Sequence, residues 1–81
     1  MSMHINVKLF ATLHRYGRGV RPGIPFEIEL PEDATVRNLV DQLNIPSEET
    51  RITFVNGIIQ ELDCKLKDGD VVGMFPPIGG G

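Results

Sequence analysis

Two stretches in the first part of the chain alternate between polar and apolar residues. Residues 4–10 read HINVKLF, and residues 26–30 read FEIEL before Pro31, which has no N–H to give to a sheet. A period of two places every second side chain on one face, so each stretch predicts a strand with one buried face. The intervening residues 11–24 are rich in glycine and proline. They predict a long loop, with one helical turn at its start.

A helical pattern follows within residues 32–43. Four apolar residues recur there at the spacing i, i+3, i+4 and i+7 and predict one buried helix face: Val36, Leu39, Val40 and Leu43. Thr35 is the expected N-cap. Glu32 and Asp33 precede it, where the positive end of the helix dipole favours negative charge. Pro46 opposes continuation of the helix.

The last third of the chain predicts three more strands, at residues 51–55, 58–60 and 71–75. Asn56-Gly57 separates the first two and is a strong hairpin signal, because both residues tolerate positive φ. The resulting order, β-β-α-β-β-β, predicts an α+β domain in two layers. We expect a β-grasp (ubiquitin-like) fold, with a mixed sheet of four to five strands packed on one main helix.

Composition and charge narrow the possible functions. The chain has 81 residues, a formal charge of −3 and a pI near 5.2, which argues against general binding of nucleic-acid phosphates. It contains one cysteine, Cys64, so no internal disulfide can form, and we expect a reducing compartment. Neither a signal peptide nor an apolar run of membrane-spanning length is evident. We therefore expect a cytoplasmic location.

The most informative segment is residues 76–81, which we separate as a tail from a domain of residues 1–75. It reads PPIGGG. Six residues reach about 20 Å when extended at about 3.3–3.6 Å each. Prolines stiffen the start of this arm, and glycines lack the Cβ that would clash inside a narrow channel. This composition predicts that the arm delivers the Gly81 carboxylate into another protein's active site. There ATP could adenylate the carboxylate, and a sulfur donor could displace AMP to leave a thiocarboxylate.

Three segments carry a resemblance to a known family. They are Val55-Asn56-Gly57, the run Leu66-Lys67-Asp68-Gly69-Asp70-Val71-Val72, and the ending Phe75-Pro76-Pro77-Ile78-Gly79-Gly80-Gly81. In this order they resemble the MoaD/ThiS sulfur-carrier family, and most of all the small subunit of molybdopterin synthase. The resemblance covers nearly the whole chain.

The resemblance implies a carrier that is not itself an enzyme. Gly81 would be the modified residue, Gly79 and Gly80 would give the tail access, and Phe75, Pro76, Pro77 and Ile78 would contact partners. Those partners would be an adenylating enzyme of the ubiquitin-activating type, a sulfur-relay protein and the large molybdopterin synthase subunit. The chain would hold no cofactor or metal of its own, and ATP would be used by the adenylating enzyme. Two departures from the family pattern are the long loop at residues 11–24 and a glycine at position 79.

Three alternative functions stay open at this point. The first is sulfur donation for thiazole and thiamine synthesis, against which Phe75-Pro76-Pro77 favours molybdopterin. The second is conjugation through Gly81 as a ubiquitin-like modifier. The third is a nucleic-acid or regulatory β-grasp module that uses the loop arginines Arg15, Arg18 and Arg21, although a solvated loop is the simpler interpretation.

Other reactive side chains receive structural interpretations. His4 and His14 lack companions for a metal site. Cys64 has no histidine partner in the sequence that would activate it, so we expect a small, partly buried residue. Asp68 and Asp70 are interpreted as turn residues. Phe75 is expected to be exposed beside the tail.

Overall fold

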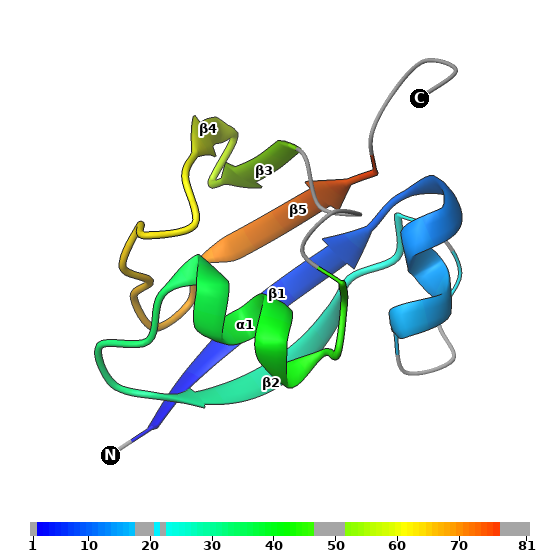
Figure 1. Cartoon of the computed structure of the whole chain (residues 1–81). Coiled ribbons are helices and arrows are strands. Elements are labelled where there is room, and N and C mark those ends of the chain that lie inside the picture. Colours follow the sequence, from blue (N-terminus) through cyan, green and yellow to red (C-terminus); the bar gives the residue numbers. More distant parts are fainter. Residues whose placement is uncertain (1, 18–20, 22, 47–51, 77–81) are drawn as a thin grey trace.

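One mixed sheet of five strands forms the framework of the protein. The computed structural model describes residues 2–17, 21, 23–46 and 52–76. In chain order the elements are β1 (Ser2–Leu9), the 3₁₀ helix η1 (Ala11–Tyr16), β2 (Phe26–Pro31), α1 (Val36–Gln42), β3 (Ile52–Val55), β4 (Ile58–Gln60) and β5 (Val71–Phe75). The strands lie in the order β2-β1-β5-β3-β4. Neighbours are antiparallel except β1 and β5, which run parallel at the centre (Figure 1).

The core lies between α1 and one face of the sheet (Figure 1). Alternate residues of the strands point into it, as the period of two requires. The largest fully buried side chains are Ile5, Leu9, Leu13, Leu30, Leu39, Met74, Val7, Val36 and Val72. They come from β1, η1, β2, α1 and β5, so a single core joins the two layers.

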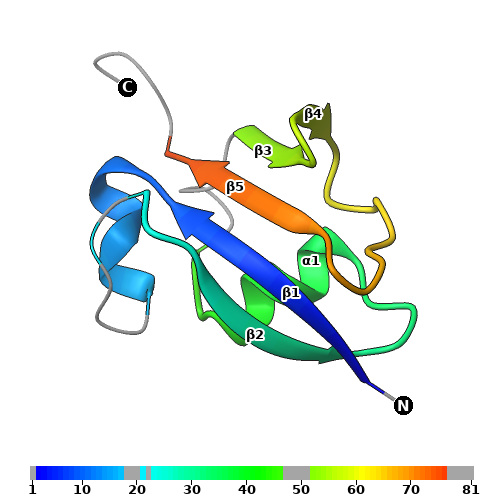
Figure 2. The same ribbon diagram turned by 180° about the vertical axis from the view of Figure 1, so that it is seen from behind.

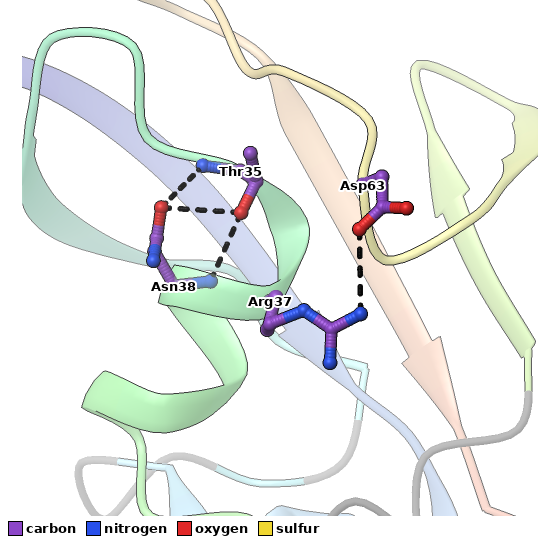
Figure 3. A network of polar contacts seen from close by, with 4 residues as sticks. All are labelled: Thr35, Arg37, Asn38 and Asp63. Atoms are coloured by element: carbon purple, nitrogen blue, oxygen red, sulfur yellow. Dashed lines mark hydrogen bonds and ion pairs between the residues drawn. The ribbon is translucent and has the colours of Figure 1, made fainter.

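Side chains and backbone carbonyls together satisfy the N-terminus of α1. Thr35 and Asn38 form a capping box: the Asn38 N–H donates to Thr35 Oγ1 over 3.3 Å, and the Thr35 N–H donates to Asn38 Oδ1 over 2.8 Å (Figure 3). The backbone N–H of Arg37 donates to the Leu62 carbonyl, and its guanidinium pairs with Asp63 at 3.3 Å. The predicted N-cap at Thr35 is thus confirmed, and the helix start is fastened to the loop after β4.

The predicted order of strands and helix is confirmed, with differences at the element boundaries. β1 begins at Ser2 and ends at Leu9, before Phe10. β2 extends through Pro31. It is an edge strand, so its outer side has no neighbouring strand that would need the N–H that proline lacks. The predicted long loop begins with the six residues of η1. Leu13 of η1 is fully buried, so burial of this side chain explains why more than one turn forms there.

Two short motifs of the C-terminal half, Asn56-Gly57 and Asp68-Gly69-Asp70, connect β5 to the neighbouring strands by hydrogen bonds. Asn56 and Gly57 both have positive φ, 53° and 84°, as a tight hairpin requires. The Asn56 amide donates to Asp70 Oδ1 over 2.9 Å, and its Oδ1 accepts the Val71 N–H over 3.0 Å. Asp68 Oδ1 accepts the His4 N–H over 2.7 Å. Asp68 and Asp70 are therefore turn residues, as predicted, and they fix where β5 begins.

Candidate functional site

The second face of the sheet is not covered by α1 (Figure 2). The residues on it alternate with the buried ones, so register determines which side chains meet there. Lys8 of β1 neighbours Gly73 of β5, and Gly73 pairs in turn with Phe54 of β3. Phe75 at the end of β5 pairs with Ile52 of β3. This face therefore gathers apolar side chains at the end of the sheet where β5 finishes.

Three phenylalanines form an aromatic cluster at the end of β5. The rings of Phe10 and Phe75 are stacked, with centroids 4.3 Å apart and planes 1° from parallel. Phe54 meets the ring of Phe75 edge-on, with centroids 5.6 Å apart and planes at 75°. Both arrangements are favourable for aromatic quadrupoles. The residue directly before Pro76 is therefore held between two rings, and the origin of the tail is fixed on the sheet.

Gly73 forms the floor of a shallow hollow beside this cluster. The hollow is lined by Lys8, Phe10, Phe54, Gly57, Val71, Gly73 and Phe75. A Cβ on Gly73 would lie 3.4 Å from Cε2 of Phe10, so the glycine leaves space that a longer side chain would fill. Three of the lining residues are phenylalanines, and Lys8 is the one lysine or arginine among the described residues that line it. Such a hollow can receive an apolar side chain of another protein.

The apolar surface continues to the edge of the sheet. Ile59 of β4 pairs with Phe54 and thus lies on the same face. Ile58 and Ile59 are 63% and 64% exposed, an unusual state for two adjacent isoleucines. We call the set of Phe10, Phe54, Phe75 and Ile59 the apolar patch. A contiguous patch of this kind typically marks a site of protein–protein contact.

The predicted site residues fall into two groups. Phe75 and Pro76 are described, whereas Pro77, Ile78, Gly79, Gly80 and Gly81 lie outside the described residues. Phe75 is half-buried, not exposed as predicted, because Phe10 covers one side of its ring. Arg18 of the arginine loop also lies outside the described residues. Arg15 stacks its guanidinium over the ring of Tyr16 at 5.2 Å, and Arg21 is exposed.

Sequence reasoning missed Phe10 and Phe54 as functional candidates. Phe10 continues the alternation of β1 on its polar side, so an apolar residue at a solvent-facing position was the available signal there. Residues 52–55 read ITFV and show no such alternation, so no comparable signal marks Phe54 in the sequence. What the sequence does not show is that both meet Phe75. That contact depends on the pairing of β5 with β1 and β3.

The remaining candidate residues take structural positions. Cys64 is half-buried against the core, as predicted, and its thiol points to the Lys65 carbonyl at 3.5 Å. His4 lies 3.9 Å from Asp68 through Nδ1. Among the residues described, no three His, Cys, Asp or Glu side chains are grouped so as to hold a metal ion. No helix in the described ranges is long and apolar enough to span a membrane.

Comparison with known proteins places this geometry in a family. Residues 7–81 match the model of the ThiS family, a range that includes the apolar patch and the glycine-rich tail. The chain belongs to the ThiS family. ThiS-family chains are small sulfur carriers of the ubiquitin-like fold, which confirms the predicted family and the predicted β-grasp architecture. No curated protein matches the chain.

Solved structures support the same assignment. A Pyrococcus furiosus protein described as a candidate molybdopterin converting factor subunit 1 is 34% identical. The similarity covers 94% of this chain and 99% of that one, with a TM-score of 0.71. Small archaeal modifier protein 1 of Haloferax volcanii is 24% identical over 94% of this chain and 99% of its own, with a TM-score of 0.73. This likeness concerns the fold alone.

A third solved structure is a complex. A chain of the complex of subunits 1 and 2 of the molybdopterin-converting factor from Helicobacter pylori is 22% identical, with a TM-score of 0.60. The match covers 98% of this ThiS-family chain and the whole of the other. At this identity the likeness again concerns the fold alone.

Proposed function

We propose that this ThiS-family chain carries sulfur on Gly81 and donates it in the synthesis of the molybdenum or tungsten pterin cofactor. The observation that carries the proposal is where the tail begins. A glycine-rich arm follows a strand end held in an aromatic cluster, on a sheet face that α1 leaves uncovered. A fixed origin, an exposed apolar surface and a side-chain-free tip are the features that insertion into a partner's active site requires.

The chemistry at Gly81 is written in two steps. A carboxylate oxygen attacks the α-phosphorus of ATP, pyrophosphate leaves, and the product is an acyl adenylate. A sulfur nucleophile such as hydrosulfide then attacks the carbonyl carbon and displaces AMP, which leaves a thiocarboxylate. Sulfur has replaced one oxygen of the carboxylate. The thiocarboxylate sulfur is softer and more nucleophilic than oxygen, so it can attack an electrophilic carbon of the acceptor.

The domain's part in these steps is presentation. We assign the ATP site to an adenylating enzyme of the ubiquitin-activating type, and the supply of sulfur to a relay protein. The apolar patch is the proposed contact surface for such partners, because Phe75 and Pro76 place it at the origin of the tail. We assign no catalytic side chain and no resident cofactor to this chain.

The choice of pterin over thiazole rests on two supports. The first is the Phe75-Pro76-Pro77 sequence at the origin of the tail. The second is the 34% identity to a protein described as a candidate molybdopterin converting factor subunit 1. A large synthase subunit is then the proposed acceptor partner, in line with the two-subunit Helicobacter complex.

Intact mass spectrometry tests the carrier function directly. The chain is incubated with ATP, a sulfur source and the adenylating enzyme of its host. The expected product is heavier by the difference between one sulfur and one oxygen atom, and fragmentation places the change on Gly81. A variant with one alanine added after Gly81 should keep the fold and gain no sulfur. Loading of that extended variant would contradict the terminal-carboxylate mechanism.

A second assay identifies the acceptor. The loaded chain is mixed with the large molybdopterin synthase subunit and its pterin precursor, or with thiazole synthase and its substrates. Sulfur appearing in the pterin alone supports the proposal, and sulfur appearing in thiazole alone refutes the pterin assignment. Adducts between Gly81 and lysine in cell extracts, without sulfur transfer, would instead support a protein modifier.

A further inference from the structure

Lys8 gives the apolar patch a feature that aromatic side chains alone do not supply. It lies on β1 beside Gly73 and lines the hollow together with Phe10, Phe54 and Phe75. The side chain is half-buried. A lysine in this state can lay its methylene stem on apolar surface and keep its ammonium group in water. Among the described lining residues, Lys8 supplies the one positive charge beside side chains that are otherwise apolar.

Within the described parts of the chain, this charge has no carboxylate partner. The described ion pairs join His4 to Asp68 and Arg37 to Asp63, and neither includes Lys8. Glu27 of β2 pairs with Asn6 in the register, so it is a diagonal neighbour of Lys8 and not a direct one. A cation that is half-buried among phenylalanines and has no internal partner is available to a carboxylate brought by another molecule.

The length of the tail limits how far a partner's active site can lie from the end of β5. The six residues from Pro76 to Gly81 can span at most about 20–22 Å when fully extended at about 3.3–3.6 Å per residue. A protein that holds the Gly81 carboxylate in its active site must therefore place its own surface close to the end of β5. The hollow runs along β5, from Val71 at its start to Phe75 at its end. Lys8 pairs with Gly73, two residues before that end. Both therefore lie within reach of a partner surface that begins at the origin of the tail.

We propose that Lys8 is a specificity-determining residue for the adenylating enzyme. The enzyme's surface presents an apolar side chain that fills the hollow over Gly73, next to an aspartate or glutamate that pairs with Lys8. This inference rests on the proposed carrier function. The apolar side chain supplies buried area, and the charge pair fixes the register between the two surfaces and rejects carriers without a cation at this position.

Two substitutions at Lys8 separate its charge from its stem. Lys8→Met keeps an unbranched apolar stem and removes the charge, and Lys8→Glu reverses the charge. The matched control is Lys65, an exposed lysine in the loop that pairs with Thr35 ahead of α1. Lys65→Met and Lys65→Glu change the net charge of the chain by the same amounts. Circular dichroism and thermal melting establish that each variant is folded.

The readout is ATP–pyrophosphate exchange by the purified adenylating enzyme of the host, with the chain as the variable substrate. Loss of a pairing charge at an interface should raise KM about 3–10-fold for Lys8→Met and about 10–100-fold for Lys8→Glu, with kcat unchanged. The Lys65 variants should stay within about twofold of the wild type, as expected for surface charges remote from the contact. Raising the ionic strength should raise KM for the wild type and have little effect on Lys8→Met.

The result that overturns the inference is a KM for Lys8→Met equal to or below that of the wild type. Equal effects of Lys8→Glu and Lys65→Glu would overturn it as well, because only net charge would then matter. Each result with an active wild-type chain leaves the carrier function standing. Absence of exchange with the wild-type chain, from an enzyme shown to be active on another carrier, would overturn both proposals. If replacing one aspartate or glutamate of the enzyme with lysine restores a low KM for Lys8→Glu, that enzyme residue is the partner of Lys8.

Discussion

Asn56→Ala should destabilise the fold more than a substitution at an exposed hairpin normally does. The side chain makes two hydrogen bonds, to Asp70 and to the Val71 N–H, and alanine removes both. Each is worth about 0.5–1.5 kcal/mol, and exposure of the site favours the lower half of that range. The backbone at Asn56 has a φ of 53°, where a residue other than glycine or asparagine adds about 1–2 kcal/mol. Together these contributions give an expected loss in the free energy of unfolding of about 2–4 kcal/mol.

Two further variants separate these contributions. Asn56→Gly loses the same hydrogen bonds but accepts the positive φ, so it should lose about 1 kcal/mol less than the alanine variant. Asn44 has a φ of 60° and no described side-chain hydrogen bond. Asn44→Ala therefore measures the backbone effect alone, and we expect a loss of about 1–2 kcal/mol.

Urea denaturation followed by circular dichroism provides the assay, with thermal melting as a second measurement. For a domain of this size, a loss of about 2–4 kcal/mol lowers Tm by about 10–30 °C. A loss below about 0.5 kcal/mol for Asn56→Ala would refute the reasoning, because it would mean that these bonds only replace equally good bonds to water. If Asn56→Ala and Asn56→Gly lose the same free energy of unfolding, the proposed contribution of the positive φ at Asn56 is refuted.

Two predictions concern the apolar patch and the hollow over Gly73 beside it. Phe75→Ala removes the stack on Phe10 and the edge contact with Phe54, each worth about 0.5–1.5 kcal/mol beyond area burial, so it should lower Tm and raise KM in ATP–pyrophosphate exchange. A variant with unchanged KM would show that the enzyme does not contact this ring. Gly73→Ala adds a Cβ that would lie 3.4 Å from Cε2 of Phe10, an ordinary van der Waals contact, so it should keep Tm within a few degrees, narrow the hollow and raise KM about tenfold. Normal exchange by this variant would mean that no partner side chain enters the hollow.

The sequence by itself determined the elements whose signals are local. The period of two in residues 26–30, the helical spacing from Val36 to Leu43 and the Thr35 cap each depend on residues within a few positions of one another. Asn56-Gly57 likewise specifies its hairpin through its own backbone preferences. The role proposed for the tail also rests on the sequence alone, because what its glycines offer is the absence of side chains.

Only the tertiary structure decided which distant residues share a surface. Phe10 and Phe75 come from opposite ends of the chain, and they stack because β1 and β5 pair in parallel at the centre of the sheet. The same register sets Lys8 beside Gly73. A strand pattern specifies which face a residue occupies but not which strand will be its neighbour. The pairing of the strands is set when all of them bury a common core under α1. That pairing brings together the residues of the candidate docking surface at the origin of the tail.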